Sequence, residues 1–289
     1  MHYSGSVYRP PSEAHSLIVQ CTLGCSHNKC AFCIMYKEKH FSINPIEQVL
    51  GDLAEAREAY RFIDRIFLAD GDALILPMDY LLTVLDYIRD HFPECERVSA
   101  YASTKALMRK SDDELKALRE HGLALIYVGL ESGSEELLAK YDKGVTAEEI
   151  ILHSLRAKEA GMTLSVTAIN GMGGKEQSEQ HALATAAALS RIKADYIAML
   201  TLRVYTGTPL HDWIERGELT MLGPLELAAE NRLILQHIDS EGSVFRSNHA
   251  SNYLPLKGTL NRDREALIQQ IDKALAGEVR FRRAVELGL

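Results

Sequence analysis

Four of the chain's five cysteines lie in one stretch, Cys21-Thr-Leu-Gly-Cys25-Ser-His-Asn-Lys-Cys30-Ala-Phe-Cys33, just after the apolar run Leu17-Ile-Val19. The sequence has neither a secretory signal nor a long apolar span, so we expect a cytoplasmic protein that does not contact a membrane. In that compartment clustered cysteines are more often metal ligands or redox groups than disulfides. The stretch therefore predicts a metal or redox site.

Two kinds of metal site fit the spacing. A structural zinc site usually needs two Cys-x-x-Cys pairs, or one pair with two histidines. The stretch has one such pair, Cys30 and Cys33, which His27 and His40 could complete. The alternative is an iron–sulfur cluster held by three thiolates, with Cys25 as the third, in the spacing C-x4-C-x2-C. Three thiolates on a 4Fe–4S cluster leave one iron for a ligand that is not protein.

Apolar runs of strand length alternate with helical segments along the chain. The strands are expected at residues 16–21, 65–69, 97–102, 124–130, 163–169 and 196–202, with a short seventh within 243–252. Such alternation is typical of a parallel sheet covered by helices. Six repeats predict an α/β fold, a partial (β/α)6 TIM-type barrel of parallel strands that is open on one side. Polar or glycine-rich residues follow the strands, at the edge where such folds build their sites.

Composition and net charge indicate an ordinary globular protein and exclude one class of binding surface. The 46% hydrophobic and 25% charged residues are those of an ordinary globular protein, and the net charge of −8 argues against a broad nucleic-acid surface. We expect residues 1–15 to form an irregular lead-in and residues 16–240 the barrel core. Residues 241–289 would then form a C-terminal segment that closes the barrel mouth.

The cysteine loop resembles the cluster loop of the radical S-adenosylmethionine (SAM) enzymes. It follows the first predicted strand, and the aromatic Phe32 precedes its last cysteine. The usual spacing in that family is C-x3-C-x2-C, one residue shorter than here. The resemblance implies that Cys25, Cys30 and Cys33 hold a 4Fe–4S cluster, and that Cys21 is a buried thiol at a strand end.

Two further segments extend the resemblance to SAM binding. Asp70-Gly71-Asp72 occupies the place of the family's Gly-Gly-Glu-Pro turn, which implies that Gly71 and Asp72 hold the amino group of SAM. The segment that begins at Gly129 resembles one in the subfamily of oxygen-independent coproporphyrinogen oxidase and the methylthiotransferases. There Glu131 would lie near the ribose and Lys143 near the SAM carboxylate. The other cofactor-binding residues implied are Phe32, Ser103, Ser132, Asn170 and Met172. An ordinary polar loop at 70–72 and a solvated Lys143 are the simpler alternatives.

The substrate side is expected at two places near the C-terminal part of the chain. Arg203 and Tyr205 follow the sixth strand, while Asn248 and His249 lie in a run rich in Asn, His and Ser. These four are the candidate catalytic residues. A hydrogen-bonded network within a turn would explain the same run without a catalytic role.

The resemblance implies an enzyme that reductively cleaves SAM to a 5′-deoxyadenosyl radical, which abstracts a hydrogen atom from a small substrate. A reductant such as flavodoxin or ferredoxin is the expected partner. Only Cys95 lies outside the stretch, so the chain lacks the cysteines for a second cluster. The alternative is a non-catalytic iron–sulfur or zinc protein that serves as a scaffold or in electron transfer.

Overall fold

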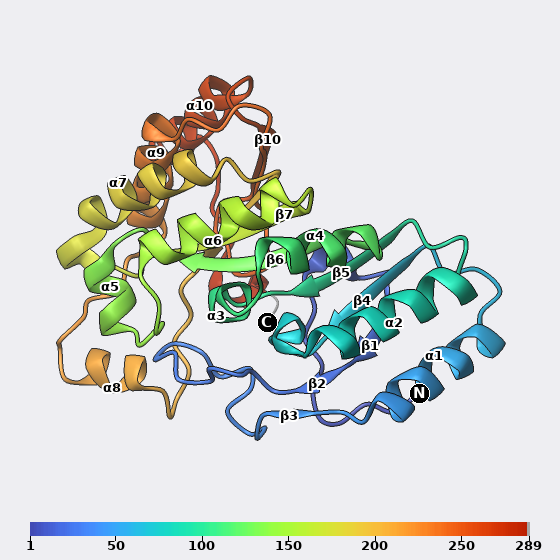
Figure 1. The fold of residues 1–289 in the computed structure, drawn as a ribbon. Coiled ribbons are helices and arrows are strands. Elements are labelled where there is room, and N and C mark those ends of the chain that lie inside the picture. Colours follow the sequence, from blue (N-terminus) through green and yellow to red (C-terminus); the bar gives the residue numbers. More distant parts are fainter. Residues whose placement is uncertain (288–289) are drawn as a thin grey trace. The chain divides into compact units, whose positions relative to one another are not determined.

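The computed structural model describes residues 1–287, which divide into two compact units. Unit 1 comprises residues 1–28, 35–128 and 152–164, and unit 2 comprises residues 29–34, 129–151 and the chain from 165 on. Strands β6 (Leu123–Glu131) and β7 (Thr163–Asn170) and helix α6 (Ala147–Glu159) each contribute residues to both units. Figure 1 gives the course of the chain.

The sheet strands of unit 1 are parallel and follow the order β1-β4-β5-β6. They are β1 (Leu17–Gln20), β4 (Arg65–Ala69), β5 (Arg97–Tyr101) and the first six residues of β6. The last four residues of β4 are all buried, as expected for a strand that is covered on both faces.

Helices α1 (Ile46–Ala59), α2 (Met78–His91) and α4 (Asp112–Glu120) follow the first three of these strands. Helix α2 buries Leu81, Val84, Leu85 and Ile88, the i, i+3, i+4, i+7 spacing of one helical face. A capping box formed by Ser111 and Glu114 begins α4. The short elements of unit 1 are η1 (Pro11–Glu13), β2 (Thr22–Leu23), β3 (Ser42–Ile43), η2 (Ala73–Ile75) and α3 (Thr104–Met108).

The N-terminal lead-in packs on one face of the unit 1 sheet. Val7 lies against a buried cluster that includes Phe67 and Tyr127. The buried carboxylate of Glu13 accepts a hydrogen bond from Tyr127 Oη at 2.5 Å and pairs with Arg97 at 2.9 Å. The lead-in is irregular apart from η1, yet it is fixed to the sheet by these contacts.

Unit 2 continues the α/β pattern. Its strands follow the order β7-β8-β9-β10, with β8 (Tyr196–Thr201), β9 (Val244–Ser247) and β10 (Leu256–Thr259). The pairs β7–β8 and β8–β9 are parallel, and β9–β10 is antiparallel. Its other elements are α5 (Glu135–Lys140), α7 (Gly174–Ile192), α8 (Pro209–Glu215), α9 (Pro224–His237), α10 (Arg264–Leu275) and η3 (Ala284–Glu286). Helices α7, α9 and α10 pack in sequence on one another (Figure 1).

The predicted α/β class with an open, mostly parallel sheet is confirmed. The sheet has eight strands: the six predicted for the barrel core, β9, which lies within the predicted seventh strand at 243–252, and β10, which was not predicted and pairs with β9 in antiparallel fashion. The domain boundaries at residues 15 and 240, and the closing of the barrel mouth by residues 241–289, remain predictions. Within residues 1–287 no helix is long and apolar enough to span a bilayer.

Candidate functional site

Asp70 fastens the cysteine loop to the end of β4 in unit 1. Its carboxylate is fully buried and pairs with Lys39 Nζ at 2.7 Å. The same carboxylate accepts the backbone N–H of Gly24, the residue before Cys25, at 3.1 Å. Gly24 has a φ of +73°, which favours glycine, and its carbonyl accepts the N–H of Gly71 at 3.0 Å. The half-buried Cys25 is thus held next to the turn that follows β4.

Asp72 lies at the centre of a second set of contacts in unit 1. Its carboxylate is fully buried and accepts hydrogen bonds from the hydroxyls of Ser26 and Ser103, the latter at 2.7 Å, and from the Ser103 N–H at 2.9 Å. Ser103 also caps α3, because its hydroxyl accepts the N–H of Ala106. The structure therefore brings together two predicted cofactor residues, Asp72 and Ser103, with the residue that follows Cys25.

Gly71 lies beneath the ring of Tyr36. A Cβ at this position would come within 2.6 Å of Tyr36 Cε2. The Tyr36 side chain is buried, so it has little room to move away. Glycine is required here by the close approach of the ring and not by an unusual backbone conformation.

Cys21 differs from the other cysteines of the stretch. It is fully buried, and burial raises the pKa of its thiol to about 12. The thiolate is the form that binds metals. This environment agrees with the prediction of Cys21 as a buried thiol at a strand end.

The segment Cys30-Ala-Phe-Cys33 belongs to unit 2, where Ala31 anchors it. The Ala31 N–H donates to the carbonyl of Tyr141 at 2.9 Å, and its carbonyl accepts the N–H of Leu210 at 3.1 Å. One backbone position between the two cysteines is therefore tied to the end of α5 on one side and to the start of α8 on the other. The Cys33 N–H donates to the carbonyl of Cys30 at 3.2 Å, so the pair forms a tight turn.

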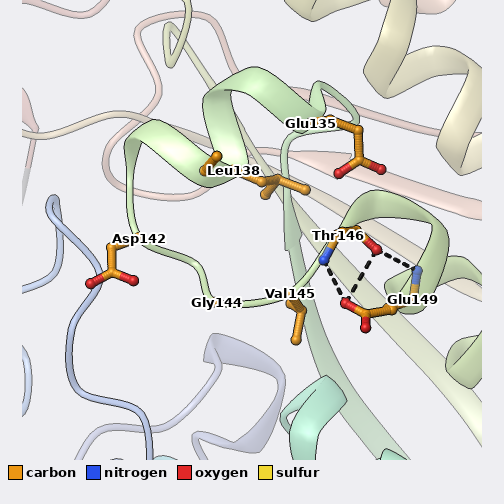
Figure 2. Close-up of a pocket in the computed structure, with 8 residues that line it drawn as sticks. Glu135, Leu138, Asp142, Gly144, Val145, Thr146 and Glu149 are labelled. Atoms are coloured by element: carbon orange, nitrogen blue, oxygen red, sulfur yellow. Dashed lines mark hydrogen bonds between the residues drawn. The ribbon is translucent and has the colours of Figure 1, made fainter.

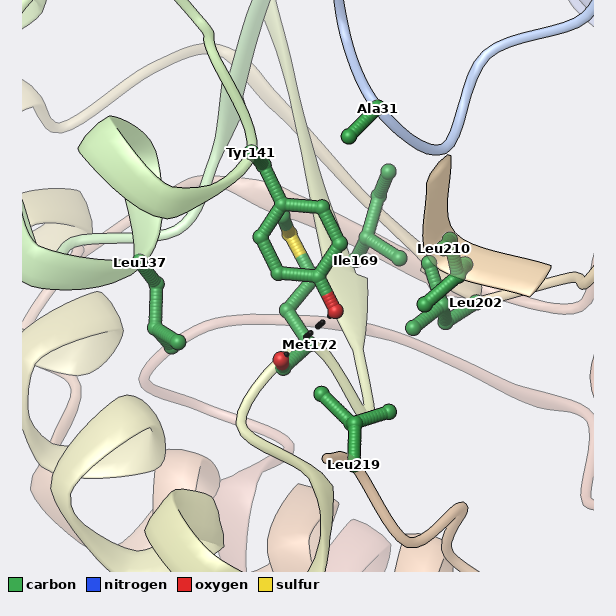
Figure 3. Close-up of a cluster of buried hydrophobic side chains, with 8 residues drawn as sticks. All are labelled: Ala31, Leu137, Tyr141, Ile169, Met172, Leu202, Leu210 and Leu219. Carbon is green, nitrogen blue, oxygen red and sulfur yellow. Dashed lines mark hydrogen bonds between the residues drawn. The ribbon is translucent and has the colours of Figure 1, made fainter. Parts of the chain in front are cut away.

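An apolar cluster supports this turn. Figure 3 shows the Tyr141 ring among buried side chains from α5, β7 and α8. Phe32 packs edge-on against Tyr141, with ring centroids 5.9 Å apart. The Tyr141 hydroxyl donates to the carbonyl of Met172 at 2.9 Å, so Met172 is held by its backbone. The cluster consists of Ala31, Leu137, Tyr141, Ile169, Met172, Leu202, Leu210 and Leu219.

Glu131 and Lys143 form an ion pair in unit 2. The distance from Lys143 Nζ to Glu131 Oε1 is 2.9 Å, and both side chains are mostly buried. Gly129 provides the floor of the pair, since a Cβ there would lie 2.0 Å from Glu131 Oε1 and 2.9 Å from Lys143 Nζ. The sequence predicts both charged residues as cofactor contacts, and the structure places them directly together.

Ser132 bonds to a buried histidine. Its hydroxyl lies 2.8 Å from His181 Nδ1, and His181 Nε2 lies 3.0 Å from the carbonyl of Ile169. Burial lowers the pKa of His181 to about 4, so the ring is neutral at pH 7. A carbonyl only accepts, so we assign the ring proton to Nε2 and the Ser132 hydroxyl as donor to Nδ1. Ser132 is thus engaged in an internal link between β6 and α7.

Asn170 ends β7 with a fully buried side chain. Neither its Nδ2 nor its Oδ1 has a hydrogen-bond partner within the part of the chain that the structure describes. Buried amides are almost always hydrogen-bonded, so a complementary polar group is the natural partner. Asn170 is therefore the predicted cofactor residue whose unused hydrogen-bonding capacity is clearest.

Glu230 of α9 fixes the turn after Asn170. Its buried carboxylate accepts the N–H of Gly171 at 2.6 Å and the hydroxyl of Ser178 at 2.5 Å. Burial raises the pKa of Glu230 to about 7. The sequence gives no signal for Glu230 or His181, because Glu230 lies 59 positions from Gly171 and His181 lies 49 positions from Ser132.

Arg203 and Tyr205 lie in the segment between β8 and α8, and both are half-buried. The carbonyl of Tyr205 accepts the N–H and the hydroxyl of Thr208, the residue that caps α8. Among the described residues no hydrogen bond joins the side chain of Arg203 or Tyr205 to Asn248 or His249. Their shared substrate role remains a prediction.

The run around His249 forms a hydrogen-bonded turn. His249 Nδ1 accepts the N–H of Ser251 at 3.1 Å and lies 2.9 Å from its hydroxyl. Asn252 donates to the carbonyl of Met199 at 2.7 Å and accepts from the hydroxyl of Thr201 at 2.9 Å. These bonds tie the turn to β8 and account for the buried Ser and Asn residues of the run. Burial lowers the pKa of His249. Asn248 is exposed and takes no part in these contacts.

A pocket of about 300 Å³ lies beside the loop from α5 to α6, and its lining includes Asp142 and Gly144, which flank Lys143 in the sequence (Figure 2). Thr146 and Glu149 form its capping contacts at the start of α6. Its lining residues are Glu135, Leu138, Ala139, Asp142, Gly144, Val145, Thr146 and Glu149.

The chemistry of the donor set fits an iron–sulfur cluster. Cys25 lies in unit 1 and Cys30 and Cys33 in unit 2, and all three are partly exposed, unlike Cys21. As far as residues 1–287 describe it, neither unit by itself gathers three His, Cys, Asp or Glu side chains into a ready metal site. The assignment of the three thiolates therefore remains a prediction.

The match to a known protein family covers the cysteine stretch and the segment that contains Glu131. The profile of the radical SAM superfamily matches residues 19–189, more than half of the chain. The heme chaperone HemW of Bacillus subtilis (strain 168) is 22% identical over 227 residues, which are 75% of this chain and 58% of that protein. The chain spans 23% to 58% of the length of the curated relatives it matches.

Two solved structures resemble the fold. Methylornithine synthase (PylB) superimposes with a TM-score of 0.57 at 13% identity, over 89% of this chain and 68% of that one. The radical SAM methyltransferase TsrM from Kitasatospora setae, solved with cobalamin and a 4Fe–4S cluster, gives 0.55 at 18% identity, over 68% and 38%. At these identities the likeness concerns the fold alone, a partial barrel of the TIM type.

Proposed function

Because the chain belongs to the radical SAM superfamily, a family of enzymes with a 4Fe–4S cluster and SAM as cofactors, we propose that it reductively cleaves SAM and abstracts a hydrogen atom from a small substrate. Bound together, the cluster and SAM supply a 5′-deoxyadenosyl radical. The protein's own residues hold the cofactors, orient the substrate and exclude water.

Cys25, Cys30 and Cys33 are the proposed cluster ligands. The observation that carries the proposal is the anchoring of the Cys30–Cys33 turn through Ala31, which packs with Phe32 in the Tyr141 cluster between the two cysteines. Such a turn is pre-organised, so little conformational freedom is lost on binding a metal group. The burial of Cys21 supports its exclusion from the ligand set.

Several buried polar groups support SAM binding. The Asn170 amide has donor and acceptor capacity that suits a nucleoside. The Glu131 carboxylate can accept from vicinal hydroxyls, and Lys143 can pair with a carboxylate. Asp72 is proposed to receive the ammonium group beside Gly71. The remaining proposed contacts are Phe32, Ser103, Ser132 and Met172, and the substrate side is proposed at Arg203, Tyr205, Asn248 and His249.

The partners and the location follow from the same proposal. The reaction needs one electron at low potential, so a reductant such as flavodoxin or ferredoxin is proposed as the donor. A cytoplasmic location suits a cluster that must be kept reduced. The family match favours the enzyme over a scaffold that only carries the metal.

Anaerobic reconstitution with iron and sulfide, followed by dithionite and SAM, tests the proposal. We expect 5′-deoxyadenosine from the wild type, and neither iron loading nor product from Cys30→Ala. Cys95→Ala is the matched control, since Cys95 lies outside the stretch, and Cys21→Ala is expected to load iron as well. Zinc in place of iron in the wild type, or full iron loading in Cys30→Ala, would refute the assignment.

A further inference from the structure

Two cations stand directly opposite each other on β9 and β10. The antiparallel register pairs Arg246 with Lys257. Residues that are directly opposed in such a pair project from the same face of the sheet. The parallel registers add Ala198 of β8 beside Arg246, and Thr167 of β7 beside Ala198. One row across four strands of unit 2 thus consists of two small or short residues followed by two cations.

This row lies on the face of unit 2 that α10 does not cover. Phe245, which precedes Arg246, is fully buried and is paired with Gly258. A Cβ on Gly258 would contact Asp263 and Leu267, at the start of α10. Strand residues alternate between faces, so Arg246 and Lys257 project from the other side. Both side chains are exposed.

Among the described residues, no carboxylate pairs with either of the two charges. Within residues 1–287 neither Arg246 nor Lys257 takes part in an ion pair, and Arg246 Nη1 donates only to the carbonyl of Phe245 at 3.0 Å. Like charges directly opposite each other destabilise a strand pair. The chain as a whole has a net charge of −8, so an excess of cations does not explain the pair. An anion between them would remove the repulsion.

The row lies a short distance behind the edge where the site is expected. Strands β7, β8 and β9 are parallel, so their carboxyl ends meet at one edge. Thr167 is three residues from the end of β7 at Asn170, which at about 3.3 Å per residue is about 10 Å. That distance suits a small metabolite held at one end by its anionic group, with its other end near Asn170.

We propose that Arg246 and Lys257 form the anion-binding subsite for the substrate, which therefore carries a carboxylate or a phosphate. This inference rests on the proposed function, and it names the substrate class for the same enzyme. The guanidinium fork of Arg246 can bind two oxygens of either anion, and Lys257 supplies a point charge from the neighbouring strand. The hydrogen atom to be removed would lie at the opposite end of the substrate.

Anion binding to the reconstituted full chain tests the subsite without any substrate. Inorganic phosphate and succinate are titrated separately by calorimetry at low ionic strength, in the absence of SAM. We expect saturable binding of one or both, weakened at least tenfold in Arg246→Gln/Lys257→Gln. The preferred probe distinguishes a phosphate from a carboxylate. Lys273→Gln is the matched control, because Lys273 is an exposed cation on α10.

Three outcomes would overturn the subsite: no saturable binding of either probe, equal binding by the double variant, or equal weakening by Lys273→Gln. Folding is checked by thermal unfolding, and the single variant Lys257→Thr is expected to melt at or above the wild-type temperature because it removes the repulsion. SAM cleavage by the wild type is measured in parallel. Cleavage with equal anion binding by the double variant refutes the subsite alone, whereas anion binding without cleavage refutes the proposed function.

Discussion

Gly71 is the residue of the site at which the structure allows the least change. Its ideal Cβ would lie 2.6 Å from Tyr36 Cε2 and 3.0 Å from Cδ2 and Cζ. The buried ring would have to shift, and overpacking of this kind costs about 1–3 kcal/mol. We therefore expect Gly71→Ala to lower the free energy of unfolding by about that amount, as measured by urea titration.

Gly51 provides the matched control. It lies within α1, and a Cβ there would meet nothing within 4 Å. Alanine is favoured over glycine inside a helix by about 0.5–1 kcal/mol, so Gly51→Ala should stabilise the protein. Opposite signs for the two substitutions would identify the Tyr36 contact as the cause, and equal signs would contradict it.

Asp72 illustrates what the sequence could and could not tell about single residues. Its place after a predicted strand marked it as a site residue. The two hydroxyls that bind it belong to Ser26 and Ser103, which lie 46 and 31 positions away in the sequence. No local pattern predicts such contacts, because they depend on how the loops after different strands approach one another.

Glu230 of α9 fixes the turn between β7 and α7. Its carboxylate accepts the N–H of Gly171, so a side chain of α9 binds the backbone of the turn after β7. Glu230→Ala leaves that buried N–H without an acceptor, which costs about 1–3 kcal/mol. We expect faster hydrogen exchange at the Gly171 amide and weaker SAM binding, because Asn170 precedes it.

Two further variants make the Glu230 prediction specific. Glu230→Gln keeps an acceptor oxygen and should largely preserve the protection of the Gly171 amide. Gln236→Ala alters an exposed residue of the same helix and should leave both readouts unchanged. Equal exchange at Gly171 in all variants would show that the turn does not depend on this carboxylate.

Elements with a strong apolar period were predictable, and short polar ones were not. The strand expected at 65–69 has the bounds of β4 in the structure, and the apolar residues of α2 recur at helical spacing. Strand β4 is apolar on both faces, and helix α2 is apolar along one face. Helix α8 and strand β10 were missed. Helix α8 has only 7 residues and strand β10 only 4. Strand β10 also carries Lys257 and Gly258, which obscure the alternation of apolar and polar residues that is typical of a strand.

Across the molecule, recognition of the family needed residues that are local in sequence, whereas the chemistry needed contacts that are not. The cysteine spacing and the segment at Glu131 could be identified directly. The pairing of Glu131 with Lys143, and the buried pair of Glu230 and His181, come only from the fold. The pKa values of Glu230 and His181 shift in opposite directions on folding. The pH dependence of the free energy of unfolding is therefore a sensitive test of the structure around these two groups.

Glu230 and His181 should impose opposite pH dependences on unfolding. Folding raises the pKa of Glu230 from 4.5 to about 7, so between these values the folded chain holds a proton that the unfolded chain has lost, and stability falls as pH rises. Folding lowers the pKa of His181 from 6.5 to about 4, so the unfolded chain holds the extra proton there, and stability rises with pH. From pH 4.5 to 6.5 the two slopes, each about 1.4 kcal/mol per pH unit, oppose each other.

Because the two pH dependences oppose each other in the wild type, each should become measurable when the other group is replaced. Relative to the wild type, Glu230→Gln removes the falling contribution, so its unfolding free energy should gain about 3 kcal/mol between pH 4.5 and 6.5. His181→Gln removes the rising contribution and should lose a similar amount over the same range. Urea unfolding at pH 4.5, 5.5 and 6.5 measures both, and Gln236→Ala should follow the wild type throughout. Parallel profiles for all four proteins would mean that neither group is buried with the protonation inferred here, because a side chain that titrates alike in both states adds no slope.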